Sequence, residues 1–291
     1  MLNALVDYRI ELNLWIALSI LIYTVSVNLA WRWRLPRPGR LAPWIEKVKG
    51  WSLASWLLQL LRLVYYVGLP FCLLLNGDAV ERSLRRFLGF SIPPVGFLMR
   101  GVLLPRAMGL GGATTSEWFA GIGIGIALGL GAFFLMASGW WYFAHSVRTL
   151  PWGQTGSPDP GANIGEPVAV ATSFSTQAWW AILWEAIYAE MHWAFYRAGP
   201  IILLDNFYAG VFLGFLILSF EWWTNPAWRR NWDTVTQRPD VVLSWSLAFV
   251  MAIIFLFTRN LWLAITLHWA IEMGYRQLLP VPQHGKGPQL R

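Results

Sequence analysis

Apolar runs as long as a bilayer is thick constrain the fold of this chain more than any other feature. A helix needs about 20 mostly apolar residues to cross the hydrocarbon core, and several runs approach or reach that length. The runs are continuous rather than alternating, which disfavours a transmembrane β-barrel. The pattern therefore predicts an all-α polytopic transmembrane bundle of about seven spans, at residues 12–31, 51–75, 118–141, 178–196, 201–223, 241–257 and 261–275.

Composition supports a membrane domain. The chain is 56% hydrophobic and 13% charged, whereas about a quarter of the residues of a soluble domain are charged. Its 21 Trp residues suit the membrane–water interface. Basic loops facing anionic headgroups explain the net charge of +7, and no basic patch indicates nucleic-acid binding. We expect a multi-pass protein of a bacterial-type inner membrane, with the lipid bilayer as its partner.

One helical domain is expected over residues 1–279, followed by a disordered tail at 280–291 that is rich in Pro, Gly and Gln. Val80–Phe90 is amphipathic and resembles an interfacial helix. Ser91–Leu104 is too short to cross, so a re-entrant segment is expected there. The basic loop Arg32–Lys49 predicts a cytoplasmic position. Seven spans then place the tail on the same side.

Two local patterns predict packing rather than chemistry. Gly121, Gly125 and Gly129 recur at intervals of four in the third span. Small residues at this spacing allow another helix to approach closely, so we expect a packing groove there. Pro70 lies inside the second span and predicts a distortion, because proline has no N–H to donate to the preceding turn.

Ionisable side chains inside three of the predicted spans indicate a site. Such groups are expensive to bury and persist mostly where they pair, line a cavity or bind a ligand. His268 and Glu272 in the last span are four residues apart and therefore share one helix face. The fourth and fifth spans contribute the remaining members, which are Glu185, Glu190, His192, Arg197 and Glu221.

Four of these residues form a plausible first coordination shell. His192, Glu221, His268 and Glu272 are two imidazoles and two carboxylates from three helices, which suits a divalent metal, zinc first. Metal-bound water is a nucleophile at neutral pH. Without a metal, a carboxylate is able to act as general base while an imidazole stabilises the oxyanion. The set therefore predicts hydrolytic chemistry, with or without a metal.

Simple structural roles remain open for each of these residues. His268 would hydrogen-bond across helices, and Glu272 would pair with Arg276 one turn later. Glu221 would lie at the membrane edge, and Arg197 would extend its guanidinium to the headgroups. These readings predict a stable bundle without catalysis.

The seventh span resembles the last motif of the CPBP family of intramembrane proteases (CAAX-processing and bacteriocin-processing, Rce1-type). The family motif is a Leu-Trp-rich run followed by His-x-x-x-Asn, and residues 259–272 fit it except that Glu272 replaces the Asn. Phe195-Tyr-Arg-Ala-Gly199 is similar to the Phe-Phe-Arg-Gly that ends the family's Glu-Glu-x-x-x-Arg motif. The resemblance covers about residues 60–277.

This resemblance implies a protease or peptidase that cleaves a membrane-anchored peptide or protein within the bilayer. It places the site among spans four, five and seven, with the catalytic set Glu190, His192, Arg197, Glu221, His268 and Glu272.

Two departures from the family pattern leave alternatives open. Aligned on Arg197, the family's catalytic glutamate falls on His192 and its first histidine on Glu221, so Glu and His have exchanged places. One interpretation is a swapped set that keeps an active site, with Glu190 or Glu185 replacing the missing base. The other is a degenerate, non-catalytic relative that acts as a scaffold, or that binds a metal or tetrapyrrole through a histidine.

Overall fold

The computed structural model describes residues 2–34, 51, 54–68, 70, 104–111, 114–149, 178–233 and 238–278, and all regular structure within these ranges is helical. The all-α prediction is thereby confirmed for the described residues. Val80–Phe90, nearly all of Ser91–Leu104, most of Arg32–Lys49 and the tail 280–291 lie outside them. The elements are α1 (Leu2–Arg34), α3 (Ala54–Leu63), the π-helix η1 (Val64–Gly68), α6 (Thr115–Thr149), α7 (Trp179–Leu204), α8 (Phe207–Thr224), α9 (Pro226–Asp233), α10 (Arg238–Thr258) and α11 (Leu261–Leu278).

Four helices are long and apolar enough to cross a membrane, which indicates a membrane protein. They are Leu12–Arg32, Ser116–Tyr142, Phe207–Thr224 and Asp240–Thr258, and they match the first, third, fifth and sixth predicted spans. The predicted count of seven is not confirmed. Within the described residues, α7 and α11 fall short because ionisable and polar side chains lower their hydropathy, and the second predicted span is described only in part.

Apolar side chains cover the outer surface of α1 and α6. In the most apolar 18-residue stretch of each of these two helices, only 11% is buried inside the protein. Phe134 and Leu135 of α6 are 64% and 74% exposed. In water such a surface would favour aggregation or binding of a partner. In a bilayer it contacts lipid tails without penalty. The exposure is therefore consistent with a lipid environment.

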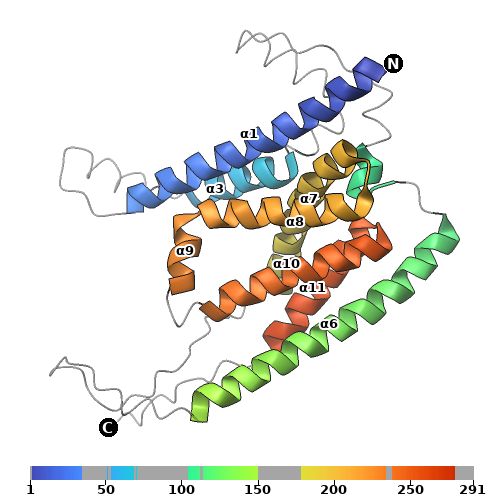
Figure 1. Ribbon diagram of the computed structural model, residues 1–291. Helices are drawn as coiled ribbons and strands as arrows, with labels where there is room; N and C mark the ends of the chain where they lie inside the picture. The colour runs from blue at the N-terminus through green and yellow to red at the C-terminus, as the bar shows by residue number, and fades with distance from the viewer. Residues whose placement is uncertain are drawn as a thin grey trace, which may run out of the picture.

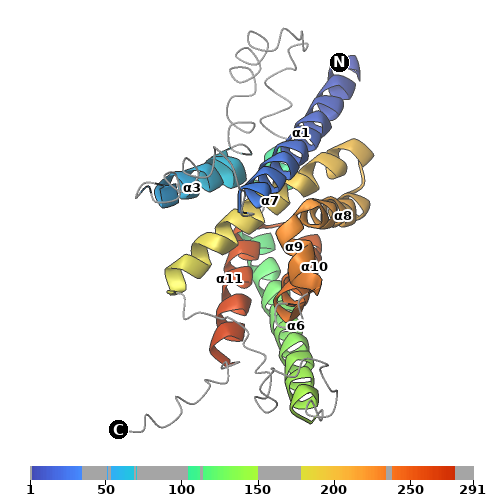
Figure 2. The ribbon, with the colours of Figure 1, turned by 90° about the vertical axis from the view of Figure 1, so that its left-hand side faces the viewer.

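Helix α7 crosses the centre of the bundle (Figures 1 and 2), in contact with α1, α8, α11 and η1. Every residue from Glu190 to Pro200 is buried. Two glycines of α8 allow the closest of these approaches. A Cβ at Gly210 would fall 2.5 Å from the Cα of Ile201, and one at Gly214 would fall 2.7 Å from the Cα of Arg197. The α7–α8 pair is therefore packed backbone against backbone.

The break between the fourth and fifth predicted spans lies further along the chain than expected. The prediction ends a span at residue 196, whereas α7 continues through Pro200 to Leu204. Proline removes only the hydrogen bond to the carbonyl four residues earlier, and packed neighbours hold the helix together there. The chain turns at Asp205, which has a left-handed φ of 50°, and the Asn206 side chain caps α8 by accepting from the Ala209 N–H at 3.0 Å.

The packing groove predicted from the glycine spacing is confirmed. A Cβ at Gly125 would lie 2.9 Å from Leu263 Cδ2, and one at Gly129 would lie 3.3 Å from Leu267 Cδ2. The groove of α6 therefore holds α11, which carries His268. The helical path before Pro70 also widens into the π-helix η1, in keeping with the distortion predicted there.

Candidate functional site

All six predicted site residues lie on three neighbouring helices, α7, α8 and α11. Five of them are almost completely buried, with relative exposures of 0% for Glu190, 2% for His192, 2% for Arg197, 1% for Glu221 and 4% for His268. The side chain of Glu272 is 17% exposed. The side chains of Arg197 and Glu221 therefore face the interior of the bundle. Buried charges of this kind need partners.

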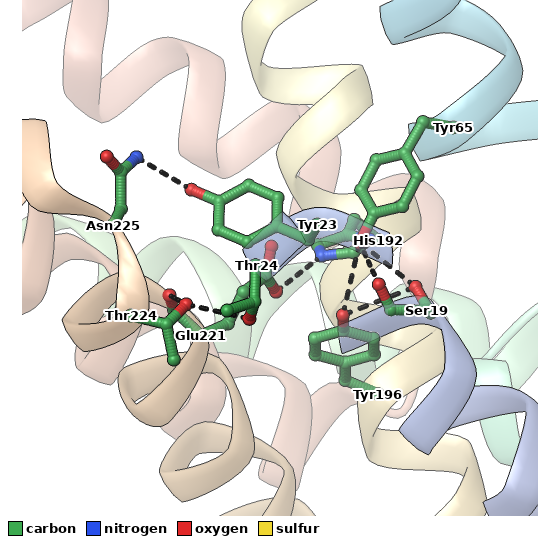
Figure 3. Close-up of polar contacts among 9 residues, drawn as sticks. All are labelled: Ser19, Tyr23, Thr24, Tyr65, His192, Tyr196, Glu221, Thr224 and Asn225. Carbon is green, nitrogen blue, oxygen red and sulfur yellow. Dashed lines mark hydrogen bonds and ion pairs between the residues drawn. The ribbon is translucent and has the colours of Figure 1, made fainter. Parts of the chain in front are cut away.

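His192 and Glu221 are one such pair. The Nε2 atom of His192 on α7 lies 2.8 Å from Oε2 of Glu221 on α8 (Figure 3). The side chains are 3% and 1% exposed, and the close α7–α8 packing brings them together. The imidazole therefore meets the carboxylate directly.

Tyrosines enclose His192. The ring centroids of Tyr196, Tyr66 and Tyr65 lie 4.2, 4.9 and 5.4 Å from that of the imidazole. The hydroxyls of Tyr65 and Tyr196 both reach Ser19 Oγ of α1, at 3.0 and 3.3 Å. Tyr196 lies four residues after His192 and therefore shares its helix face, whereas no spacing in the sequence indicates that the two tyrosines of η1 lie beside it. The pocket around His192 is aromatic and hydroxyl-rich.

Hydrogen bonds also connect the C-terminal end of α8 to α1 beside this pair. Thr224 Oγ1 donates to the backbone carbonyl of Glu221 at 2.7 Å and accepts from Thr24 Oγ1 at 3.0 Å. Asn225 Nδ2 donates to the hydroxyl of Tyr23 at 3.0 Å. Figure 3 shows these contacts beside the His192–Glu221 pair. They fix the position of α8, and hence of Glu221.

Glu190 organises a separate cluster. Its Oε2 accepts from the Arg197 guanidinium at 3.2 Å, two helical turns along α7. Its Oε1 lies 2.9 Å from Nδ1 of His268 on α11. The Arg197 guanidinium also lies 4.1 Å from the centre of the Phe255 ring, in a cation–π contact. The carboxylate is thus held by two groups from two helices.

Glu190 also occupies one nitrogen of His268. An ionised carboxylate only accepts hydrogen bonds, so Nδ1 of His268 donates to Glu190 and Nε2 is the nitrogen left for other contacts. The ring of Trp193 stacks against the imidazole at 5.2 Å with an angle of 27° between the planes. Together these contacts fix the orientation of the ring and aim Nε2 away from Glu190.

The Nε2 edge of His268 faces Glu272. The distance from Nε2 to Glu272 Oε2 is 3.7 Å, too long for a hydrogen bond. Glu272 Oε1 accepts from Arg276 at 2.5 Å, as the i, i+4 alternative predicted. This edge is the least buried part of the cluster. A basic nitrogen and a carboxylate oxygen therefore flank a point toward the rim of the site.

The four predicted metal ligands divide between these two clusters. Within the described ranges, no three or more His, Cys, Asp or Glu residues gather so as to hold a metal ion. Ligand atoms around a tetrahedral zinc lie about 3.3 Å apart at bond lengths of about 2.0 Å, whereas the two imidazole–carboxylate contacts are 2.8 and 2.9 Å. His268 Nε2 and Glu272 Oε2 alone provide two ligands, one fewer than the three protein ligands of catalytic zinc sites. The set does not fit a catalytic zinc.

Glu185 belongs to neither buried cluster. It forms a two-pronged ion pair with Arg62 of α3, at 3.0 and 2.5 Å. The two side chains remain 44% and 38% exposed. Of the two glutamates that were considered as replacements for the family's base, Glu190 is therefore the one that contacts a histidine.

A double-mutant cycle is expected to separate the two kinds of pair. For His192→Ala and Glu221→Ala we expect a coupling free energy of about 2 kcal/mol in unfolding. Removal of either partner of a buried pair abolishes most of the interaction free energy between them. The exposed Arg62–Glu185 pair, measured in the same way, should give less than about 1 kcal/mol. Equal coupling in the two cycles would contradict the buried contact.

Comparison of this chain with family models, with curated proteins and with solved structures finds no match.

Proposed function

We propose that this chain is a multi-pass intramembrane peptidase of CPBP type that cleaves a membrane-anchored peptide in a bacterial-type inner membrane. One observation carries the proposal. His268 is oriented by a buried carboxylate, Glu190, and presents its other nitrogen toward Glu272 near the rim of the site. A carboxylate-oriented imidazole is a recurrent general base in peptide hydrolysis.

In this reaction His268 Nε2 removes a proton from a water molecule that contacts both Nε2 and Glu272 Oε2 from one side. The oxygen attacks the scissile carbonyl, and the imidazolium then returns the proton to the leaving amine, so that one water is consumed for each bond broken. Glu190 stabilises the imidazolium, as the carboxylate of a catalytic triad does. Arg197 keeps that carboxylate in place. Glu272 accepts the second hydrogen of the water and orients its lone pair.

The exchanged positions support the resemblance on which this proposal also rests. His192 and Glu221 fall where the family has Glu and His, and they contact each other at 2.8 Å. Both residue types are therefore retained at the two positions, in exchanged order. We assign this pair to positioning, because it fastens α7 to α8 and so holds Glu190 on the other side of α7.

A non-catalytic scaffold is the second candidate, and the same burial favours it, because paired charges inside a bundle also fasten helices together. Tetrapyrrole binding receives less support. An axial ligand needs a ring nitrogen directed at open space. The Nδ1 atom of His268 contacts Glu190, its ring face contacts Trp193 and its Nε2 faces Glu272 Oε2 at 3.7 Å, while His192 is enclosed by tyrosine rings.

The deciding experiment uses the full chain purified into liposomes with membrane-anchored peptides. We expect wild-type cleavage, and a loss of at least about a hundredfold in His268→Gln, since general bases contribute about 10²–10⁴-fold. His145→Gln, at an exposed histidine of α6, is the matched control and should retain full rate. A metal chelator should leave the rate unchanged. Unchanged cleavage by His268→Gln would exclude His268 as the general base, and no cleavage by wild type would favour the scaffold.

A further inference from the structure

A cavity of about 580 Å³ lies between α6, α10 and α11, away from both buried clusters. Its walls are mainly apolar, and they include Leu135, Trp140, Val242 and Phe249. This volume lies in the range of about 300–1,000 Å³ that is typical of ligand sites. None of the proposed catalytic residues lines it. The cavity therefore has no role in the peptidase proposal.

The cavity opens onto the lipid-facing surface. Leu135, Val242 and Phe249 line it and are also 74%, 46% and 43% exposed. Leu135 belongs to one candidate span and the other two to another. A ligand therefore enters sideways from the hydrocarbon region, and it must itself be apolar along most of its length.

One end of the cavity is cationic. Arg238 lines it and is exposed, two residues before the candidate span Asp240–Thr258 begins. Its Nε donates to the backbone carbonyl of Trp232 at 2.8 Å, which restrains the guanidinium without using its two terminal nitrogens. Arginine is well suited to phosphate, because its planar donors match phosphate oxygens. The position of Arg238 is that of a headgroup contact.

The length of the cavity matches one leaflet. From Arg238 to Phe249 the helix rises about 16 Å at 1.5 Å per residue, close to half of the roughly 30 Å hydrocarbon core. An acyl chain that begins at Arg238 would therefore end near the bilayer midplane. Trp140 and Tyr275, which also line the cavity, are of the residue types that gather at headgroup level.

We propose that this cavity binds an anionic glycerophospholipid, with one acyl chain between α6 and α10 and its phosphate on Arg238. The proposal is independent of the catalytic one. The charge of Arg238 selects anionic over zwitterionic headgroups, and the apolar walls select a membrane lipid over a soluble phosphate.

Native mass spectrometry of the detergent-purified full chain tests this, with phosphatidylglycerol and phosphatidylcholine of equal acyl chains as probes. We expect wild type to prefer phosphatidylglycerol about fivefold, the effect of one basic residue near an anionic headgroup. Arg238→Gln should remove this preference. Arg229→Gln, at an exposed arginine of α9 outside the cavity, should keep it. Equal binding of both lipids by wild type, or a preserved preference in Arg238→Gln, would overturn the proposal.

A second pair of variants tests the cavity itself. A Cβ at Gly139, which lines the cavity, or at Gly131 on the same helix would meet no neighbouring group within 4 Å among the described residues. Gly139→Leu should fill the cavity and reduce binding of both lipids at least tenfold, whereas Gly131→Leu should bind as wild type does. If Gly139→Leu fails to fold, Ser246→Phe fills the cavity from the opposite wall instead. Full lipid binding by a folded, filled variant would refute the site.

Discussion

Glu190→Ala is expected to lower the free energy of unfolding by about 3–5 kcal/mol, the usual cost of removing one partner from a buried ionic cluster. The substitution leaves the Arg197 guanidinium and the Nδ1 proton of His268 buried without their acceptor. Equilibrium unfolding of the purified protein in mixed micelles measures the change.

The same helix provides the control. Glu185→Ala removes a carboxylate whose ion pair with Arg62 is well exposed, and it should change stability by less than about 1 kcal/mol. Adding Arg197→Met to Glu190→Ala should recover part of the loss, because the uncompensated charge is then gone. Equal destabilisation by Glu185→Ala and Glu190→Ala would contradict the central role of Glu190.

Gly210→Val is expected to destabilise the protein by about 3 kcal/mol and to separate α7 from α8. A Cβ at this position meets backbone atoms of Ile201 at 2.5–2.6 Å, and backbone, unlike a flexible side chain, has no alternative rotamer. The helices must therefore move apart. The expected loss of stability lies at the upper end of the usual cost of overpacking. Thermal unfolding of the purified protein measures the loss.

Gly123→Val is the matched control for this change. Gly123 lies in α6, where an added Cβ meets no neighbouring group within 4 Å among the described residues, and the same β-branched residue should cost less than about 1 kcal/mol there. Because the α7–α8 contact brings His192 to Glu221, Gly210→Val should also abolish the coupling between those two residues. A stable Gly210→Val variant that retains this coupling would be incompatible with the packing described.

The sequence was sufficient for the helical class and for contacts within one helix. Continuous apolar runs predicted seven spans, of which four correspond to helices long enough to cross a membrane. Helical spacing also indicated the Glu272–Arg276 pair as one alternative for Glu272. The interval of seven residues between Glu190 and Arg197, about two helical turns, is also compatible with the contact that the structure contains. These results follow because helical geometry alone determines which residues share a face.

Contacts between helices were beyond that reasoning. The spacing of His192, Glu221 and His268 suggested one shared centre, whereas His192 faces Glu221 and His268 faces Glu190. Periodicity gives the face of each helix, but not how far a neighbouring helix is rotated or shifted against it. Glu190 and His192 are two residues apart on α7, about 200° around the axis, so they were bound to face different neighbours.

The burial of Glu190 and Arg197 also has a consequence for how the chain enters the membrane. These charges raise the free-energy cost of inserting α7 into a membrane as a single helix. Only two residues, Asp205 and Asn206, separate α7 from the strongly apolar α8, so the pair is suited to partition as one hairpin. His268 follows Glu190 by 78 positions, so in such a hairpin Arg197 would face that carboxylate before the histidine is synthesised. The arginine would then act as an internal counter-ion that lowers the cost of placing the acid in an apolar environment.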